Sequence, residues 1–410
     1  MSVTDDALSV SRFSIEVPEE VLSDLRERLG RTRWPGQLPG IGWAQGTELG
    51  FLRKFCAYWR EEFDWRAQER RLNALPQFVA RVQGQDIHFL HVRGLGPDPF
   101  PLILTHGWPS SFAEFARLVP LLSDPARHGA PAGDSFDVVV PSMPGYGFSP
   151  APHERFASSR VPELWAALMA GLGYERFGAH GGDIGGGVSA RLAQLYPELV
   201  AGIHVTNVYG SIKPGSRPPT PIELAYLDRA GSWEREEGAY AEIQATRPQT
   251  LAYGLTDSPA GLAAWIIEKQ RAWSDCGGVV EDAIGIDDLL ANLTIYWATG
   301  SIASSLRPYW DSRNNPSPRE WKPVTVPSAV AVFPKDIDIP PREFAERYYN
   351  VQRYTRMPRG GHFPAIEQPE ALAGDIRDFF RGLRGGQRPP GSGTGARSSS
   401  TGRAAQPGSR

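Results

Sequence analysis

A run of small residues between an apolar segment and a helical segment is the feature that most constrains this chain. Residues 177–187 read Phe-Gly-Ala-His-Gly-Gly-Asp-Ile-Gly-Gly-Gly, and a helical pattern follows until Pro197, which cannot continue a helix. A strand, a sharp glycine turn and a helix in this order are typical of a nucleophile elbow, which lifts one residue above a sheet between small neighbours. The residue at the apex is Asp183 rather than serine. The sequence therefore predicts chemistry that uses a carboxylate.

Short apolar runs alternate with helical segments on both sides of this turn. We expect strands at 87–92, 102–105, 136–140, 176–180, 200–205, 329–333 and 351–354, separated by helices that include 112–122, 161–172 and 369–383. Such alternation is typical of an α/β fold with a mostly parallel, doubly wound sheet and an active site at the carboxyl edge of its strands.

The pattern changes along the chain and suggests five segments. We expect a flexible N-terminus at 1–10, a helical arm at 11–95, a core at 96–208 and 308–385, a helical lid at 209–307, and a disordered tail at 386–410. In the arm, apolar residues recur at helical spacing, a pattern that indicates helix faces packed against the rest of the protein. In the lid we expect helices at 224–240, 261–273 and 286–305. The tail has no acidic residue and consists largely of Gly, Pro, Ser, Thr, Arg and Gln, a composition that cannot bury a core.

Composition excludes several classes of function. Of 410 residues, 41% are hydrophobic and 22% charged, and the formal net charge of −3 gives no electrostatic case for binding nucleic acid or an anionic membrane. The two cysteines, Cys56 and Cys276, suggest neither a metal site nor a disulfide framework. No apolar run approaches the roughly 18 residues that span a bilayer. We expect a soluble, cytoplasmic protein without cofactor or metal, with a homo-oligomer left open.

Asp183 can be interpreted in two ways. An aspartate in a glycine turn often caps the following helix. However, glycines surround it on both sides, as an elbow requires, and a carboxylate at a helix N-terminus stays ionised. Such a group needs no base to activate it and can attack an sp³ carbon to form an ester. It is poorly suited to cleaving an amide or an ester, because the adduct would be a reactive anhydride.

A base and an acid follow later in the chain. His362, in Gly-Gly-His-Phe-Pro, comes after the last expected strand, where a histidine can reach the apex residue and activate water. The segment Pro-Lys-Asp-Ile-Asp after the strand 329–333 supplies a carboxylate, Asp336 or Asp338, that would orient His362. The order nucleophile, acid, histidine is that expected of α/β-hydrolases.

A second turn leaves a strand at His106-Gly107-Trp108-Pro109. We expect backbone N–H groups here to point into the site as an oxyanion hole, with a companion N–H from Ile184. A simple turn made by Gly107 and Pro109 is the alternative.

With these motifs identified, the sequence resembles the epoxide hydrolases of the microsomal type, over about residues 12–383. The matching stretches, in order, are Phe63-Asp64-Trp65, Asp86-Ile87-His88-Phe89, His106-Gly107-Trp108-Pro109, Pro144-Gly145-Tyr146-Gly147-Phe148-Ser149, Gly181-Gly182-Asp183, residues 257–264 and Gly360-Gly361-His362-Phe363. The resemblance implies the α/β-hydrolase fold, an aspartate nucleophile at Asp183 and a His362–Asp336 pair, with Asp338 as a less favoured acid. It also implies two lid tyrosines, Tyr240 and Tyr309, that donate to the epoxide oxygen.

The resemblance implies hydrolysis of a small apolar epoxide by water to a vicinal diol. Ile184 stands where this family commonly has tryptophan, so we expect a pocket floor of different shape. The same residue speaks against the main alternative, a haloalkane dehalogenase, which needs N–H donors for its halide. A non-catalytic binding protein on the same fold is the third hypothesis, although all three candidate catalytic residues are present.

Overall fold

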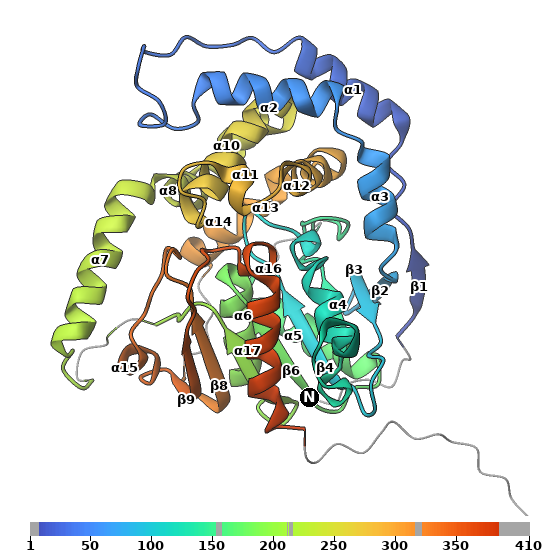
Figure 1. Ribbon diagram of the computed structural model, residues 1–410, viewed down its shortest axis with the longest axis vertical. Helices are drawn as coiled ribbons and strands as arrows, with labels where there is room; N and C mark the ends of the chain where they lie inside the picture. The colour runs from blue at the N-terminus through green and yellow to red at the C-terminus, as the bar shows by residue number, and fades with distance from the viewer. Residues whose placement is uncertain (1–7, 153–157, 211, 213–215, 316–321, 385–410) are drawn as a thin grey trace, which may run out of the picture.

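The computed structural model describes residues 8–152, 158–210, 212, 216–315 and 322–384, and these form a nine-stranded sheet covered by helices (Figure 1). The strand order is β1-β2-β3-β5-β4-β6-β7-β8-β9. The first three pairs are antiparallel and the five that follow are parallel. The predicted α/β class with a mostly parallel sheet is confirmed. The expected tail at 386–410 and most of the expected flexible N-terminus lie outside the described residues.

All seven expected strands are present, with longer bounds in most cases. They are β3 (Gln85–Val92), β4 (Phe100–Thr105), β5 (Phe136–Pro141), β6 (Phe177–Gly181), β7 (Val200–Val205), β8 (Val324–Val332) and β9 (Tyr349–Arg356). Two further strands, β1 (Val10–Phe13) and β2 (Gln77–Val82), extend the sheet at one edge. Val10, which we expected in the flexible end, instead pairs with Ala80. The arm therefore contributes strands to the sheet as well as helices.

Helices cover both faces of the sheet. On one face α4 (Leu118–Ser123) packs against α17 (Pro369–Arg381), and on the other α5 (Val161–Gly171) packs against α6 (Asp183–Leu195). The helix expected at 112–122 is wrong in one respect, because it is divided into a 3₁₀ turn, η1 (Phe112–Phe115), and α4. Pro120 lies in the first turn of α4, where its missing N–H has no helical partner.

Most helices of the lid lie over the carboxyl edge of the sheet, while the first of them runs down beside the sheet (Figure 1). The lid helices are α7 (Pro221–Glu237), α8 (Ala239–Thr246), α9 (Pro248–Asp257), α10 (Pro259–Trp273), α11 (Val280–Ala283), α12 (Ile286–Thr299), α13 (Ile302–Ser305) and α14 (Arg307–Asn314). Three helices are expected here: α7 and α10 correspond to the first two, and the third, at 286–305, is divided into α12 and α13. The divisions follow local chemistry: prolines begin α9, α10 and the first turn of α14, and Gly300 with φ 62° ends α12. α14 packs on α8, which brings residues 308–314 of the expected core segment against the lid.

The helices of the arm lie across the lid. α1 (Glu19–Gly30) and α2 (Leu49–Glu61) pack on α10, and α3 (Trp65–Asn73) packs on α12. The buried indole of Trp59 donates from Nε1 to Oγ1 of Thr294 on α12, over 3.0 Å. The arm thus holds the lid against the core, in addition to packing on the core itself.

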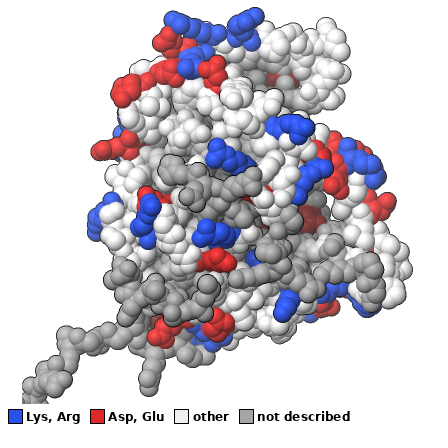
Figure 2. Space-filling model, turned by 180° about the vertical axis from the view of Figure 1, so that it is seen from behind, with Lys and Arg blue, Asp and Glu red and all other residues white. Residues whose placement is uncertain are grey.

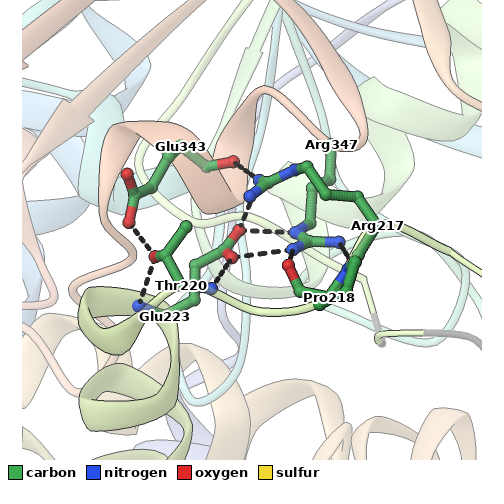
Figure 3. A network of polar contacts seen from close by, with 6 residues as sticks. All are labelled: Arg217, Pro218, Thr220, Glu223, Glu343 and Arg347. Atoms are coloured by element: carbon green, nitrogen blue, oxygen red, sulfur yellow. Dashed lines mark hydrogen bonds and ion pairs between the residues drawn. The ribbon is translucent and has the colours of Figure 1, made fainter.

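A network of ion pairs fixes the start of the lid to the core, and we call it the lid anchor (Figure 3). Glu223 on α7 is buried and binds Arg217 and Arg347, while Thr220 caps α7 and also contacts Glu343 on α15 (Arg342–Ala345). Arg347 hydrogen bonds lower the pKa of Glu223 to about 2. The lid anchor therefore depends on an ionised Glu223.

Charges are mixed over the face seen in Figure 2, where acidic and basic side chains alternate among uncharged residues. This distribution agrees with the small net charge of −3. Within the described ranges, no helix is both long enough and apolar enough to cross a membrane.

Candidate active site

Asp183 lies in the turn between β6 and α6 and is the first residue of α6. Its φ of 48° is positive, a conformation that residues other than glycine seldom adopt. A non-glycine residue held in such a conformation marks a place where the surrounding structure compensates for strain. The elbow predicted from the sequence is therefore present, with Asp183 at its apex.

The glycines around Asp183 make room for this turn. A Cβ atom on Gly107 would lie 2.4 Å from Cβ of Asp183, and one on Gly185 would lie 1.9 Å from the carbonyl oxygen of Thr105. A Cβ on Gly181 would lie 2.3 Å from the carbonyl carbon of Gly185. A larger residue at 107 or 185 would push the elbow away from the end of β4, and one at 181 would push β6 away from α6.

The Asp183 carboxylate is held on one side by the turn after β4. Its Oδ1 accepts a hydrogen bond of 2.8 Å from the backbone N–H of Trp108. The backbone N–H of Asp183 itself donates to Oδ1 of Asn207, over 2.6 Å. Asn207 was missed from the sequence, although it stands just after β7, at the same edge of the sheet, which is the signal that could have identified it.

His362 lies between two carboxylates. Its Nδ1 is 2.7 Å from Oδ1 of Asp336, and its Nε2 is 3.5 Å from Oδ2 of Asp183. Burial acts to lower the pKa of His362, but the charges and hydrogen bonds of Asp336 and Asp183 outweigh it and raise the pKa above its ordinary value. The structure thus brings together the three residues that the sequence analysis singled out.

Asp338 lies apart from this histidine contact. Its Oδ1 accepts a hydrogen bond of 2.6 Å from the hydroxyl group of Tyr226 on α7. Burial raises the pKa of Asp338 to about 6. Of the two candidate acids, Asp336 contacts His362, and Asp338 links the core to the lid.

Tyr240 on α8 and Tyr309 on α14 face the same site from the lid. The ring of Trp108 stacks on Tyr240 with centroids 5.3 Å apart, and it meets Tyr309 edge to face at 6.0 Å. Burial, followed by the charge of Asp183, raises the pKa of both phenols. Both hydroxyl groups therefore stay protonated near neutral pH and can donate a hydrogen bond.

The turn at 106–109 is braced from two directions. The buried ring of His106 accepts from the backbone N–H of Met143 through Nε2, over 3.1 Å, so this side chain supports the loop and does not face the site. On α12, the amide of Asn292 donates to the carbonyl oxygen of Pro109, and the hydroxyl of Tyr296 to that of Ser110. The lid thus positions the turn that holds Asp183.

A large cavity adjoins the elbow. It measures about 490 Å³ and is lined by Ile184 and Val188 of α6, by Met143 and Tyr146, and by residues of α9, α13 and α14. Its exposed surface is mostly apolar. Ile184, expected to shape the pocket floor, is part of its wall.

The described residues contain no group of three or more side chains that could hold a metal ion. Cys56 and Cys276 are buried and unpaired with each other.

Comparison with known proteins places this geometry in a family. The model of the epoxide hydrolase N terminus matches residues 10–115, and that of the alpha/beta hydrolase fold matches residues 101–261. A putative epoxide hydrolase of Stigmatella aurantiaca is 42% identical over 92% of this chain and 86% of its own length. Epoxide hydrolase 1 of Oryctolagus cuniculus is 38% identical, over 90% and 88%.

Solved structures agree with the sequence relatives. The juvenile hormone epoxide hydrolase of the silkworm Bombyx mori superposes with a TM-score of 0.83 at 31% identity, covering 92% of this chain and 95% of that one. The epoxide hydrolase of Aspergillus niger gives 0.81 at 28% identity, covering 92% and 97%. The chain therefore belongs to the epoxide hydrolase family, and it is an enzyme with the α/β-hydrolase fold.

Proposed function

We propose that this enzyme hydrolyses an epoxide to a vicinal diol through a covalent ester on Asp183. The observation that carries the proposal is the position of the Asp183 carboxylate: Oδ1 accepts from the Trp108 N–H, while Oδ2 faces His362 at 3.5 Å. One oxygen is thus held by a backbone donor, and the other is free to form a bond. A backbone donor at this oxygen stabilises the negative charge that develops when the ester is later attacked.

In the first step, Oδ2 of Asp183 attacks an epoxide carbon and the C–O bond of the ring breaks. The electron pair of that bond moves to the ring oxygen, which takes a proton from Tyr240 or Tyr309. Two phenols with raised pKa values are suited to this task, because they carry their protons at neutral pH and donate only as the alkoxide forms. A hydroxyalkyl ester of Asp183 results.

In the second step, water attacks the ester carbonyl carbon and His362 Nε2 takes one of its protons. The ester oxygen leaves as the second hydroxyl of the diol, protonated by His362. The other proton of the water, now on the Asp183 carboxyl group, returns through solvent to the tyrosinate, so that the Asp183 carboxylate and the phenol are both restored. Asp336, 2.7 Å from Nδ1, stabilises the imidazolium that forms between the two events. Formation of the ester removes the charge of Asp183, which lowers the pKa of His362 and makes it a base when one is needed.

The substrate that fits best is an apolar epoxide of moderate size. The cavity beside Ile184 holds about 490 Å³, within the usual range for small-molecule sites, and its wall is mostly apolar. Several of the relatives are named juvenile hormone epoxide hydrolases, so juvenile hormone is one epoxide to test.

One observation favours a second candidate, a haloalkane dehalogenase. The indole Nε1 atoms of Trp108 and Trp273 are buried without a hydrogen-bond partner among the described residues, and indole N–H groups can hold a halide. Against it, Ile184 offers no side-chain donor next to the nucleophile, whereas two tyrosines suit an alkoxide.

Product analysis separates the two. We expect diol formation from at least one of a set of styrene-type, aliphatic and terpene epoxides, and no halide release from matched chloro- and bromoalkanes. Rapid halide release without diol formation would favour the dehalogenase instead.

A further inference from the structure

A second, smaller cavity lies against the Asp183–His362 pair, and a larger share of its lining is polar than in the large cavity. It measures about 20 Å³ and is lined by Ser110, Glu114, His180, Asp183, Thr206 and His362, closed by apolar residues that include Phe115 and Leu372. We call it the inner cavity. It has no lining residue in common with the large cavity beside Ile184.

The inner cavity has the size and chemistry of a site for one water molecule. A cavity needs roughly 10–15 Å³ to hold a water, together with two to four polar partners. His362 supplies one partner, because its buried Nε2 makes no hydrogen bond within the described residues and stands 3.5 Å from Asp183, beyond a good direct bond. Glu114 and Ser110, in the lining of the same cavity, supply others.

Glu114 is a half-buried acid that the proposed mechanism has not used. It lies on η1, and burial raises its pKa to about 8, against the opposing effects of the Ser110 hydroxyl and of His362. An acid of this kind is neutral or only partly ionised near pH 7. In either form one carboxyl oxygen can accept a hydrogen bond from a water molecule.

An adjoining cavity of about 10 Å³ continues from Glu114 towards the surface, and we call it the outer cavity. It shares Ser110 and Glu114 with the inner cavity and is also lined by Gln270, whose buried Oε1 has no hydrogen-bond partner within the described ranges. Its lining also includes Asp288 of α12, which pairs with the exposed side chains of Arg71 of the arm and Arg117. Exposed arginines therefore separate the outer cavity from solvent.

We propose that the inner cavity holds the water that hydrolyses the Asp183 ester, that Glu114 positions this water for His362, and that the outer cavity supplies it separately from the substrate. The proposal rests on the proposed function. The water gives one proton to His362 Nε2 and donates its other hydrogen to a Glu114 oxygen, while its own oxygen attacks the ester carbon. Glu114 itself exchanges no proton in this step.

The arrangement explains how water reaches an ester that an apolar product still covers. Groups that face Glu114 from the surrounding elements are Arg71, Arg117 and Asp288 on the outer side and His180, Asp183 and His362 on the inner side. The ester lies on Asp183, in the wall of the inner cavity, but the outer cavity contains neither Asp183 nor any residue that lines the substrate cavity, so a product that fills the substrate cavity leaves the Glu114 side of the route open.

The test separates the two half-reactions by rapid quench and mass analysis of the intact enzyme. We expect Glu114→Ala to form the ester at a rate within about twofold of the wild type and to hydrolyse it about tenfold or more slowly, as loss of a positioning hydrogen bond implies. The ester should then accumulate during turnover. Glu114→Gln, which keeps an acceptor oxygen, should hydrolyse the ester faster than Glu114→Ala, and Glu370→Ala on the surface of α17 should behave as the wild type.

Equal slowing of both steps in Glu114→Ala and Glu114→Gln, or no change in either variant, would overturn the proposal. A different outcome would show that the proposed function is wrong: neither the wild type nor His362→Gln would form an ester. If His362→Gln forms the ester while Glu114→Ala hydrolyses it at the wild-type rate, only the role of Glu114 is wrong.

Discussion

Nε2 of His362 stands 3.5 Å from Oδ2 of Asp183, close enough for the carboxylate charge to raise the pKa of the imidazole. Conversion of Asp183 into a neutral ester removes that charge, while Asp336 keeps its contact with Nδ1. Under the proposed mechanism, the same histidine carries a proton in the resting enzyme and becomes a base when the ester forms. We propose that this coupling delays the activation of water until the ester is present.

A pH experiment tests this coupling. We expect the rate of ester hydrolysis in a single turnover to rise with pH through a pKa lower than that of His362 in the free enzyme, since the neutral form is the active one. The free-enzyme value comes from an NMR titration of the His362 ring. Identical values in the two states would show that Asp183 does not control the base.

Removal of the lid hydroxyls should affect the first step. Tyr240→Phe and Tyr309→Phe should each slow ester formation by about 10²-fold, the usual contribution of a positioned general acid. Trp108 stacks on Tyr240, so the change in its fluorescence on alkylation offers a signal for stopped flow. Tyr253→Phe, on the exposed side of α9, is the matched control and should leave the rate unchanged. Wild-type rates in both active-site variants would exclude these phenols as donors.

A larger residue at position 184 should narrow the substrate cavity. Ile184→Trp places an indole in the wall of the 490 Å³ cavity, and we expect kcat/KM for bulky apolar epoxides to fall about tenfold or more relative to small ones. The measurement is a competition between a small and a bulky epoxide in one reaction. Ile184→Val, whose smaller side chain enlarges the cavity slightly, should raise kcat/KM for bulky epoxides relative to small ones. If both variants keep the wild-type ratio, Ile184 does not determine substrate size.

Because of the lid anchor, we expect the free energy of unfolding to depend on pH through one acidic group, Glu223. The pKa of Glu223 falls from 4.5 to about 2 on folding, chiefly through hydrogen bonds from Arg347. Its contribution to stability is therefore complete above about pH 4.5 and is lost as the pH falls through about 2. Glu223→Gln should lower the midpoint of thermal unfolding at pH 7, with a smaller difference from the wild type at each step below pH 4.5. Glu236→Gln, exposed on the same helix, should show no such dependence.

The sequence predicted the sheet and the three residues at its carboxyl edge because both depend on local patterns. Short apolar runs mark buried strands, and Asp183, Asp336 and His362 each follow one of them, in the chain order of the fold. These residues reach one another because parallel strands end at the same edge.

Site residues whose positions are set by the packing of loops and lid helices are harder to predict from the sequence. Tyr240 and Tyr309 were found only through resemblance to a family, since nothing local distinguishes them from packing tyrosines. Glu114 lies on a 3₁₀ turn that had been expected to be part of a longer helix, so its approach to His362 was not visible. The strand β1 is mostly exposed and four residues long, too short for a clear alternation.

The most direct test of the covalent mechanism is to block the second step and look for the product of the first. His362→Gln removes the base but leaves Asp183, the Trp108 N–H and both tyrosines in place. After incubation with an epoxide that the wild type converts, we predict that the intact variant gains the mass of one epoxide, and that peptide mapping locates the gain on Asp183. The double variant that carries both His362→Gln and Asp183→Asn should gain no mass. An unmodified His362→Gln protein, or an adduct on any residue other than Asp183, would contradict the mechanism.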